Sequence, residues 1–275
     1  MYVNNKKRFK KMKIKILNYN ISNGFHTLNE PYILEKNRIK LCQKIIKEEN
    51  PDILCLTEAC FAAPNPFNIK MDYQKLFGYK HVFFVSRKRQ WGNMILSRYP
   101  LGCAFSNSNA TFIGLNAEFR FKDKPLFIDV IHPSPQIRDA ERIKNISQML
   151  NKEKLTGNYI LTGDFNSLSN EDNYHNQEIK DYLGKIVLKQ ETLRALLDKK
   201  FIKFLLKQGL KDVMKKHDDS FTIPTDYMDT VKGCPLRLDY FFVSKKVKIL
   251  NARVIKNPIT EHASDHYPLV MEIEI

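Results

Sequence analysis

Hydrophobic and polar positions along the chain form short segments, most of which are typical of strands. Short apolar or alternating runs predict strands at residues 14–17, 52–57, 80–85, 94–96, 159–161, 238–243, 247–254 and 269–275. A pair of strands at 112–121 and 125–131 is predicted to turn at 122–124. Apolar residues at helical spacing predict helices over 32–49, 136–150 and 192–208. Residues 167–189 are polar, and we expect an irregular insertion beside an active site there.

This order of elements favours mixed sheets with helices outside, because many predicted strands follow one another without an intervening helix. No repeat or linker divides the chain, so we expect one domain over residues 14–275, preceded by a basic tail at 1–13. Met12 is an alternative start that would remove most of that tail. No run of about 18 apolar residues occurs, which argues against a membrane-spanning helix.

Acidic, amide and imidazole side chains recur where the predicted buried strands end. Such groups are costly beside a core unless they are paired or bind a cation. Any one of them could cap a turn or a helix, but convergence at one sheet edge explains the whole set. The residues are Asn20, Glu58, His132, Asp164, Asn166, Asp239, Asp265 and His266.

Oxygen ligands without thiolates suit a hard cation, so the set predicts Mg²⁺ or Mn²⁺ rather than zinc. Two histidines accompany the carboxylates, and no serine or cysteine nucleophile motif is present. This combination indicates hydrolysis by an activated water. Phosphate esters are the natural substrates, since a divalent ion neutralises charge that develops on phosphoryl oxygens.

The segments that carry these residues resemble the endonuclease/exonuclease/phosphatase superfamily. The matching segments are LNYNI (18–21 with its preceding leucine), PDILCLTE (51–58), GNMILSRYP (92–100), IHP (131–133), LTGDFNS (161–167), RLDYFFVS (237–244) and SDHYPL (264–269). They follow one another in the order of the family and span almost the whole chain. The resemblance implies a four-layered α/β sandwich, with two mixed β-sheets packed face to face and helices outside.

The resemblance also implies roles for individual residues. Asn20, Glu58 and Asp265 would hold the metal, with Glu58 as the main direct ligand. Asp164 would orient or deprotonate the attacking water, which Asn166 would help to hold. His266 would contact the scissile phosphate while Asp239 fixes its tautomer, and His132 would bind phosphate or assist the leaving group. Weaker candidates for phosphate contacts are Asn93, Arg138 and Arg237.

Departures from the family pattern bear on the substrate. Ser22 stands where abasic-site endonucleases and tyrosyl-DNA phosphodiesterases usually carry aspartate, and Thr57-Glu58-Ala59 replaces the Gln-Glu-Thr of the abasic-site enzymes. His132 lies where those enzymes place tyrosine, which favours the deoxyribonuclease, sphingomyelinase and phosphatase side. Trp91, the only tryptophan, is equally compatible with stacking on a base and with packing beside Gly92.

The formal net charge is +15, with a sequence pI of about 9.5. A polyanionic partner would explain this charge, but so would a lysine-rich composition, since the chain has 34 lysines and 11 arginines. The five scattered cysteines do not form a disulfide or zinc pattern, and a reducing cytoplasm is the simpler interpretation.

These features together predict a metal-dependent phosphodiesterase of the cytoplasm, a monomer that acts on nucleic acid as a nuclease or DNA-end-processing enzyme. Two alternatives stay open. One is a phosphohydrolase or sphingomyelinase-type diesterase acting on lipid head groups or small phosphate esters. The other is an inactive relative that only binds nucleic acid.

Overall fold

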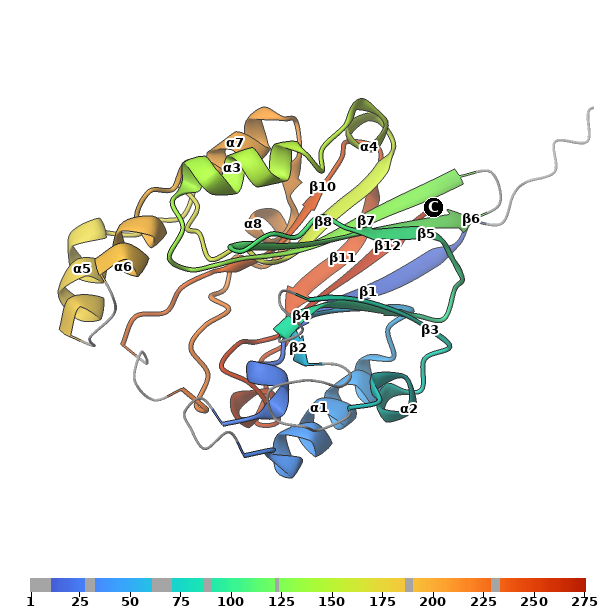
Figure 1. The fold of residues 1–275 in the computed structure, drawn as a ribbon, viewed down its shortest axis with the longest axis horizontal. Helices are drawn as coiled ribbons and strands as arrows, with labels where there is room; N and C mark the ends of the chain where they lie inside the picture. The colour runs from blue at the N-terminus through green and yellow to red at the C-terminus, as the bar shows by residue number, and fades with distance from the viewer. Residues whose placement is uncertain are drawn as a thin grey trace, which may run out of the picture.

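Two six-stranded mixed sheets form the centre of the molecule (Figure 1). The computed structural model describes residues 11–27, 33–60, 71–86, 91–121, 124–185, 190–228 and 233–275. In spatial order, the first sheet contains β11 (Lys248–Val254), β12 (Leu269–Glu274), β1 (Lys13–Asn20), β2 (Ile53–Cys60), β4 (Trp91–Ser97) and β3 (His81–Ser86). The second contains β5 (Leu101–Ser106), β6 (Phe112–Phe121), β7 (Lys124–Pro133), β8 (Asn158–Asp164), β10 (Asp239–Val243) and β9 (Lys211–Asp212). The pairs β1–β2 and β7–β8 are parallel, and the other pairs in these sheets are antiparallel.

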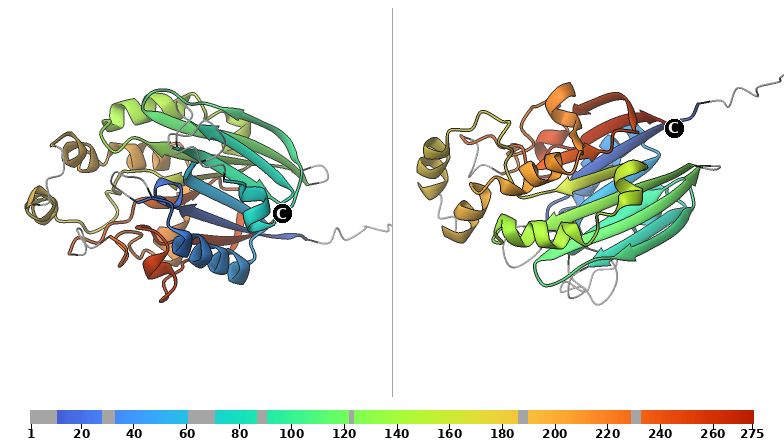
Figure 2. Two further views of the ribbon diagram at one scale, coloured as in Figure 1. Left: turned by 60° about the horizontal axis from the view of Figure 1, so that its bottom comes forward. Right: turned by 90° about the horizontal axis from the view of Figure 1, so that it is seen from above.

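Helices cover the outer face of each sheet, so the predicted four-layered α/β sandwich is confirmed (Figures 1 and 2). The first sheet is covered by α1 (Lys36–Glu49) and α2 (Tyr73–Phe77). The second is covered by α3 (Asp139–Ser147), α4 (Lys152–Thr156) and α7 (Lys200–Lys207). The helices α5 (Asn176–Lys185) and α6 (Gln190–Leu196) project at the end opposite the C-terminus, and α8 (Val213–His217) follows β9. Short 3₁₀ turns lie at Asn23–Phe25 and Thr260–His262.

The strands alternate between two apolar environments, as the period of two in a strand requires. On β1, Ile14 and Ile16 pack between the sheets, whereas Leu17 and Tyr19 pack beneath α1. The other sheet follows the same rule, with one set of side chains between the sheets and the alternate set beneath α3 and α7. Both faces of the central strands are therefore buried, which explains why their sequences are almost continuously apolar.

Three predicted helices have different limits in the structure. The helix expected at 136–150 begins at Asp139 and ends at Ser147. That expected at 32–49 begins at Lys36, and position 32 lies outside the described residues. The helix expected at 192–208 is two helices, α6 and α7, separated by Lys199 with φ 56°. The carboxylate of Asp139 accepts hydrogen bonds from the backbone of Lys200 (2.6 Å) and Phe201 (2.8 Å), so a distant side chain caps α7.

Two further segments differ from what the sequence predicts. The segment 167–189, expected to be irregular, contains helix α5. Strand β5 was not predicted, because its side chains are largely exposed and it pairs only with β6 at the sheet edge. The predicted turn at 122–124 includes positions 122 and 123, which lie outside the described residues.

Candidate active site

The stripe of side chains between the sheets changes from apolar to polar at one end of the strands. On β7, Ile128 and Val130 pack between the sheets, and His132 is the next residue on that face. On β8, Asp164 follows Ile160 with the same alternation. Asn20 and Asp239 continue the inner faces of β1 and β10 in the same way. The period of two in each strand therefore brings these four side chains to one edge between the sheets.

Glu58 reaches the same edge through a β-bulge. Strict alternation would place Glu58 beneath α1, with Leu54 and Leu56. The register between β2 and β4 shifts between Leu56 and Ala59, and Glu58 itself has φ 57°. The extra residue turns the carboxylate of Glu58 towards Asn20, whose Nδ2 donates to Oε1 at 3.0 Å. A positive φ in a residue other than glycine is uncommon, so local strain accompanies this placement.

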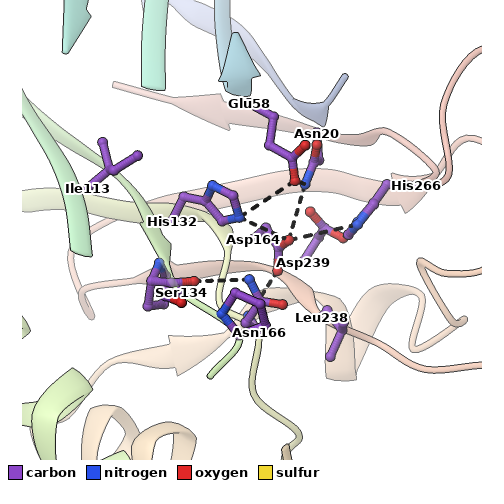
Figure 3. A network of polar contacts seen from close by, with 12 residues as sticks. Asn20, Glu58, Ile113, His132, Ser134, Asp164, Asn166, Leu238, Asp239 and His266 are labelled. Atoms are coloured by element: carbon purple, nitrogen blue, oxygen red, sulfur yellow. Dashed lines mark hydrogen bonds and ion pairs between the residues drawn. The ribbon is translucent and has the colours of Figure 1, made fainter. Parts of the chain in front are cut away.

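Asn20, Glu58, His132 and Asp164 form one compact cluster (Figure 3). The Asn20 amide also donates to Asp164 Oδ2 at 3.1 Å. His132 Nε2 lies 3.7 Å from Glu58 Oε1 and 3.6 Å from Asp164 Oδ2. The cluster therefore surrounds a point where two carboxylates and an imidazole approach one another.

A second histidine approaches Asp164 from the other side (Figure 3). His266 Nε2 lies 3.8 Å from Asp164 Oδ2, and His266 Nδ1 lies 2.7 Å from Asp239 Oδ2. The hydroxyl of Thr222 accepts hydrogen bonds from the backbone of Leu238 (3.0 Å) and Asp239 (3.2 Å), which fixes the start of β10. Asp239 thus orients His266 so that Nε2 faces Asp164.

Burial and neighbouring charge shift the pKa values of these groups in different directions. Burial raises the pKa of Asp164 to about 6, a rise that the charge of Asp239 increases and the two histidines oppose. Burial also tends to raise the pKa of Glu58, but His132, the Asn23 N–H and the Asn20 amide together hold it below its usual value. The pKa of His266 is raised well above its usual value, because Asp239 and Asp265 outweigh the effect of burial.

A left-handed turn directly after Asn20 holds the carboxylate of Glu58. Ser22, Asn23, Gly24 and Phe25 have φ values of 48°, 51°, 58° and 68°. In this turn the backbone N–H of Asn23 donates to Glu58 Oε2 at 2.8 Å. A Cβ on Gly24 would lie 2.5 Å from the Cβ of Cys60, so the turn packs directly against β2. Three non-glycine residues in this region are unfavourable without support from elsewhere.

Arg38 on α1 supplies that support. Its buried guanidinium donates to the carbonyls of Ile21 (2.6 Å) and Ser22 (3.1 Å) in the turn, and to Ala263 (3.0 Å) beside Asp265. Glu35 and Tyr227 contact the same guanidinium. Nothing in the sequence analysis pointed to Arg38, since one arginine at the start of an amphipathic helix is ordinarily exposed.

Asp265 and Asn166 lie at the edges of the cluster. Asp265 is buried, and Ser264 Oγ contacts both Asp265 Oδ1 (3.1 Å) and the carbonyl of Asn20 (2.7 Å). Burial raises the pKa of Asp265, and the charge of Glu58 adds to this rise. Asn166 has φ 46°, and its backbone N–H donates to Asp164 Oδ1 at 2.9 Å, while its side chain donates to Pro133. Ser264 thus holds the carboxylate of Asp265, and Asn166 holds that of Asp164.

The three weaker candidates have other partners. Asn93 Nδ2 donates to the carbonyls of Ile113 and Val130, both at 2.9 Å, and so joins the two sheets. Arg237 is fully buried and pairs with Asp172 (2.8 Å) and Asp212 (2.7 Å). Arg138 is mostly exposed and lies 3.5 Å from Asp198. Contact of these three side chains with a substrate stays a prediction.

The donor set fits a hard divalent cation. Ligand atoms of Glu58, His132 and Asp164 all lie within 4.8 Å of one another. The two carboxylates supply the oxygen ligands that Mg²⁺ and Mn²⁺ accept, and no thiolate is among the three residues, whereas the imidazole is a more usual ligand of transition metals than of Mg²⁺. The family resemblance implies a different set of ligands, in which Asn20 and Asp265 join Glu58. Asn20 contacts Glu58 and Asp164 directly, and Asp265 lies close enough to Glu58 for that charge to raise its pKa.

Comparisons with known proteins identify the family of the chain. A family model described as "Endonuclease/Exonuclease/phosphatase family" matches residues 17–266. The chain belongs to this family. Members are generally phosphoric ester hydrolases that use divalent metals. No curated protein sequence matches the chain significantly.

Solved structures share the fold at low sequence identity. An endonuclease/exonuclease/phosphatase from Beutenbergia cavernae has a TM-score of 0.67 and 16% identity, over 96% of this chain and 72% of that one. A family protein from Leptotrichia buccalis has a TM-score of 0.63 and 20% identity, over 95% of this chain and 100% of that one. D. rerio TDP2, solved with a single-strand DNA product, has a TM-score of 0.61 and 18% identity, over 95% of this chain and 98% of that one. None of the described helices is both long and apolar enough to cross a membrane.

Proposed function

We propose that the protein is a Mg²⁺- or Mn²⁺-dependent phosphodiesterase of the cytoplasm that cleaves nucleic acid as a monomer. The observation that carries the proposal is the pair of histidines on opposite sides of Asp164, with Glu58 beside one of them. Two imidazoles and two carboxylates at one edge provide phosphate contacts, a proton acceptor and metal ligands together.

In the proposed reaction, Glu58 would be the main ligand of the metal, while Asp164 and His132, which lie beside it, act on the water and the phosphate. When bound, the metal neutralises charge on the phosphoryl oxygens and lowers the pKa of water. Asp164, whose pKa burial raises to about 6 in the metal-free protein, accepts a proton from the attacking water at Oδ2. Asn166 holds Asp164 through its backbone N–H.

The histidines bind the other phosphate oxygens in this proposal. His266 is kept protonated by Asp239 and Asp265, so it presents a positive Nε2 to the phosphate. His132 stabilises the opposite side and assists departure of the leaving oxygen. The net charge of +15 favours a polyanionic substrate, and the similarity to a TDP2 structure that holds a DNA product supports nucleic acid.

The test is hydrolysis of bis-p-nitrophenyl phosphate and p-nitrophenyl phosphate in Mg²⁺, Mn²⁺ or EDTA, with wild type beside Asp164→Asn. Exposed Asp219→Asn serves as the control. Metal-dependent loss of the diester in wild type and control, but not in Asp164→Asn, supports the proposal. Oligonucleotides are then compared with lipid and small phosphate esters. Equal hydrolysis by wild type and Asp164→Asn would refute the proposed mechanism.

A further inference from the structure

A cavity of about 310 Å³ opens beside the catalytic cluster. Its walls include Glu58 and His132, which it shares with the cluster, together with Trp91, Thr111, Ile113 and Ser134. Ile113 and Ser134 lie on the His132 side of Asp164, away from His266 (Figure 3). A group bound here would therefore lie next to a phosphate held at the cluster. We call this cavity the Trp91 pocket.

The Trp91 pocket is the end of the space between the two sheets. On β4, Ile95 packs between the sheets, and Trp91 lies on the same face four residues earlier. On β6, Leu115 packs between the sheets, Ile113 continues that face, and Thr111 directly precedes the strand. Ile113 is directly opposite His132 in the β6–β7 register. One strand of each sheet thus contributes a wall, and the pocket and the cluster occupy one continuous edge.

Several contacts fix the width of the Trp91 pocket before any ligand binds. A Cβ on Gly92 would lie 2.0 Å from the carbonyl oxygen of Val85, so β3 and β4 are in close contact next to Trp91. Asn93 ties β4 to the carbonyls of Ile113 and Val130 in the opposite sheet. Trp91 is paired with Cys60, two residues after Glu58. The backbone that carries the indole is therefore held at a fixed position relative to the strand that carries Glu58, which reduces the reorganisation that stacking requires.

The size and composition of the pocket indicate the class of occupant. About 310 Å³ is at the small end for ligand pockets, which fits one ring system rather than an extended chain. An indole and an isoleucine provide apolar surface, and the hydroxyl-bearing Thr111 and Ser134 provide a polar margin. A nucleobase has this combination of a flat face and a polar edge, and aromatic side chains stack on any base.

We propose that the Trp91 pocket binds the base of the nucleotide adjoining the scissile phosphate, by stacking on Trp91. This inference rests on the proposed phosphodiesterase function and adds a binding site for one base. The enzyme would consequently require a base at one defined position beside the cleaved bond, while bases further along would matter less. The interaction does not depend on sequence, because every base has a face on which to stack.

A double-mutant cycle between the protein and the substrate tests the proposal. Wild type and Trp91→Ala are assayed with Mn²⁺ on a single-stranded oligonucleotide, and on a series in which one base at a time is removed. We expect Trp91→Ala to raise KM about tenfold or more for the intact substrate. Removal of one particular base should raise KM by a similar factor in wild type and have almost no further effect in Trp91→Ala. Trp91→Phe should restore most of the loss.

Intrinsic fluorescence provides a measurement that needs no variant. Trp91 is the only tryptophan in the chain, so its emission reports directly on the pocket. In EDTA, the intact oligonucleotide should quench the emission at lower concentration than the oligonucleotide that lacks the critical base. Phe105→Ala, which removes an exposed aromatic ring on β5, is the matched control and should leave both KM and quenching unchanged. Thermal melting checks that Trp91→Ala is folded, and the wild-type quenching decides the question if it is not.

The outcomes separate this inference from the function on which it rests. If wild type cleaves no oligonucleotide with Mg²⁺ or Mn²⁺, the proposed function fails and the inference fails with it. If cleavage is metal-dependent but Trp91→Ala and wild type respond equally to every missing base, only the inference is overturned. It is also overturned if Trp91→Ala raises KM for p-nitrophenylphosphorylcholine and not for oligonucleotides, because the pocket then binds a lipid head group.

Discussion

Asp239 accepts a 2.7 Å hydrogen bond from His266 Nδ1, and this contact directs the opposite nitrogen of the imidazole towards Asp164. Both side chains are buried, so the carboxylate acts on the imidazole with little screening by water. Asp239 and Asp265 are the groups that raise the pKa of His266. The pair therefore sets both the orientation and the charge of the histidine.

Asp239→Asn should lower kcat by about 100-fold or more, since an amide stabilises the protonated imidazole less and favours the other tautomer. The pKa of His266 should fall, because the negative charge of Asp239, which raises this pKa, is removed. The protonated form would then be lost at lower pH, so the alkaline limb of the kcat–pH profile should move to lower pH. The profile and an NMR titration of His266 measure both effects. An unchanged alkaline limb beside the Asp219→Asn control would contradict this role for Asp239.

The carboxylate of Glu58 contacts Asn20, Asn23 and His132. Glu58→Gln keeps the shape of the side chain but removes its charge, so Mn²⁺ should bind at least about tenfold more weakly. Calorimetric titration of the metal-free protein with Mn²⁺ measures this without any assay of activity. Glu118→Gln, which changes a carboxylate paired with Arg120 on β6, should bind Mn²⁺ like wild type. Equal affinities in all three proteins would remove Glu58 from the metal site.

The pattern of apolar residues was sufficient to predict most of the strands and most of the polar edge, whereas the pairing of the strands into two sheets was implied by the family resemblance. His132, Asp164 and Asp239 follow inward-facing positions in their own strands, and this regularity is visible in the sequence. Glu58 also ends a predicted strand, but strict alternation would have placed its side chain on the helix side of β2, away from the other polar residues. The β-bulge that redirects it depends on pairing with β4, which a single segment of sequence does not reveal.

The supporting contacts could not be predicted, because they join residues far apart in the chain. Arg38 contacts Ala263 across 225 positions, and Asp139 caps α7 from 61 positions away. The same limitation affected Arg237, whose motif suggested phosphate whereas the structure surrounds it with Asp172 and Asp212. A cation in a family motif can therefore be fully engaged in ion pairs within the fold.

Arg38 should couple the stability of the fold to the metal site. Arg38→Lys keeps the charge but cannot supply the forked donors that reach Ile21, Ser22 and Ala263 together. Unsatisfied buried carbonyls should lower the free energy of unfolding by about 2–4 kcal/mol. The left-handed turn would also hold Glu58 less firmly, so Mn²⁺ affinity should fall.

Urea unfolding in EDTA and calorimetric titration with Mn²⁺ measure these two effects of Arg38→Lys. Two controls separate them. Arg253→Lys changes a partly exposed pair with Glu49 and should alter neither quantity by much. Lys154→Met breaks the buried pair with Asp129 in the other sheet and should lower stability without weakening Mn²⁺ binding. If Arg38→Lys behaves like Lys154→Met, Arg38 supports the fold but not the metal site.

Asp164 should make the metal-free protein less stable as pH rises. Its pKa is about 6 in the folded protein and near the usual 3.8 when unfolded, so the folded state binds the proton more tightly. Above pH 6 the carboxylate is ionised in both states, and its ionisation costs the folded state up to about 3 kcal/mol. As pH falls below 6 this cost decreases, and it is lost near pH 4.

Asp164→Asn should therefore unfold at a higher urea concentration than wild type at pH 8 in EDTA. The difference should narrow between pH 6 and pH 4, where the wild-type carboxylate becomes protonated. Urea unfolding at pH 8, 6 and 5 measures the trend, and Asp219→Asn, at an exposed position, should follow wild type. Added Mn²⁺ should make wild type more stable than Asp164→Asn at pH 8, because the ion stabilises the protein that keeps the Asp164 carboxylate. A pH-independent difference would mean that burial does not disfavour the ionised Asp164, and a proton acceptor with a raised pKa would then have to be sought elsewhere in the cluster.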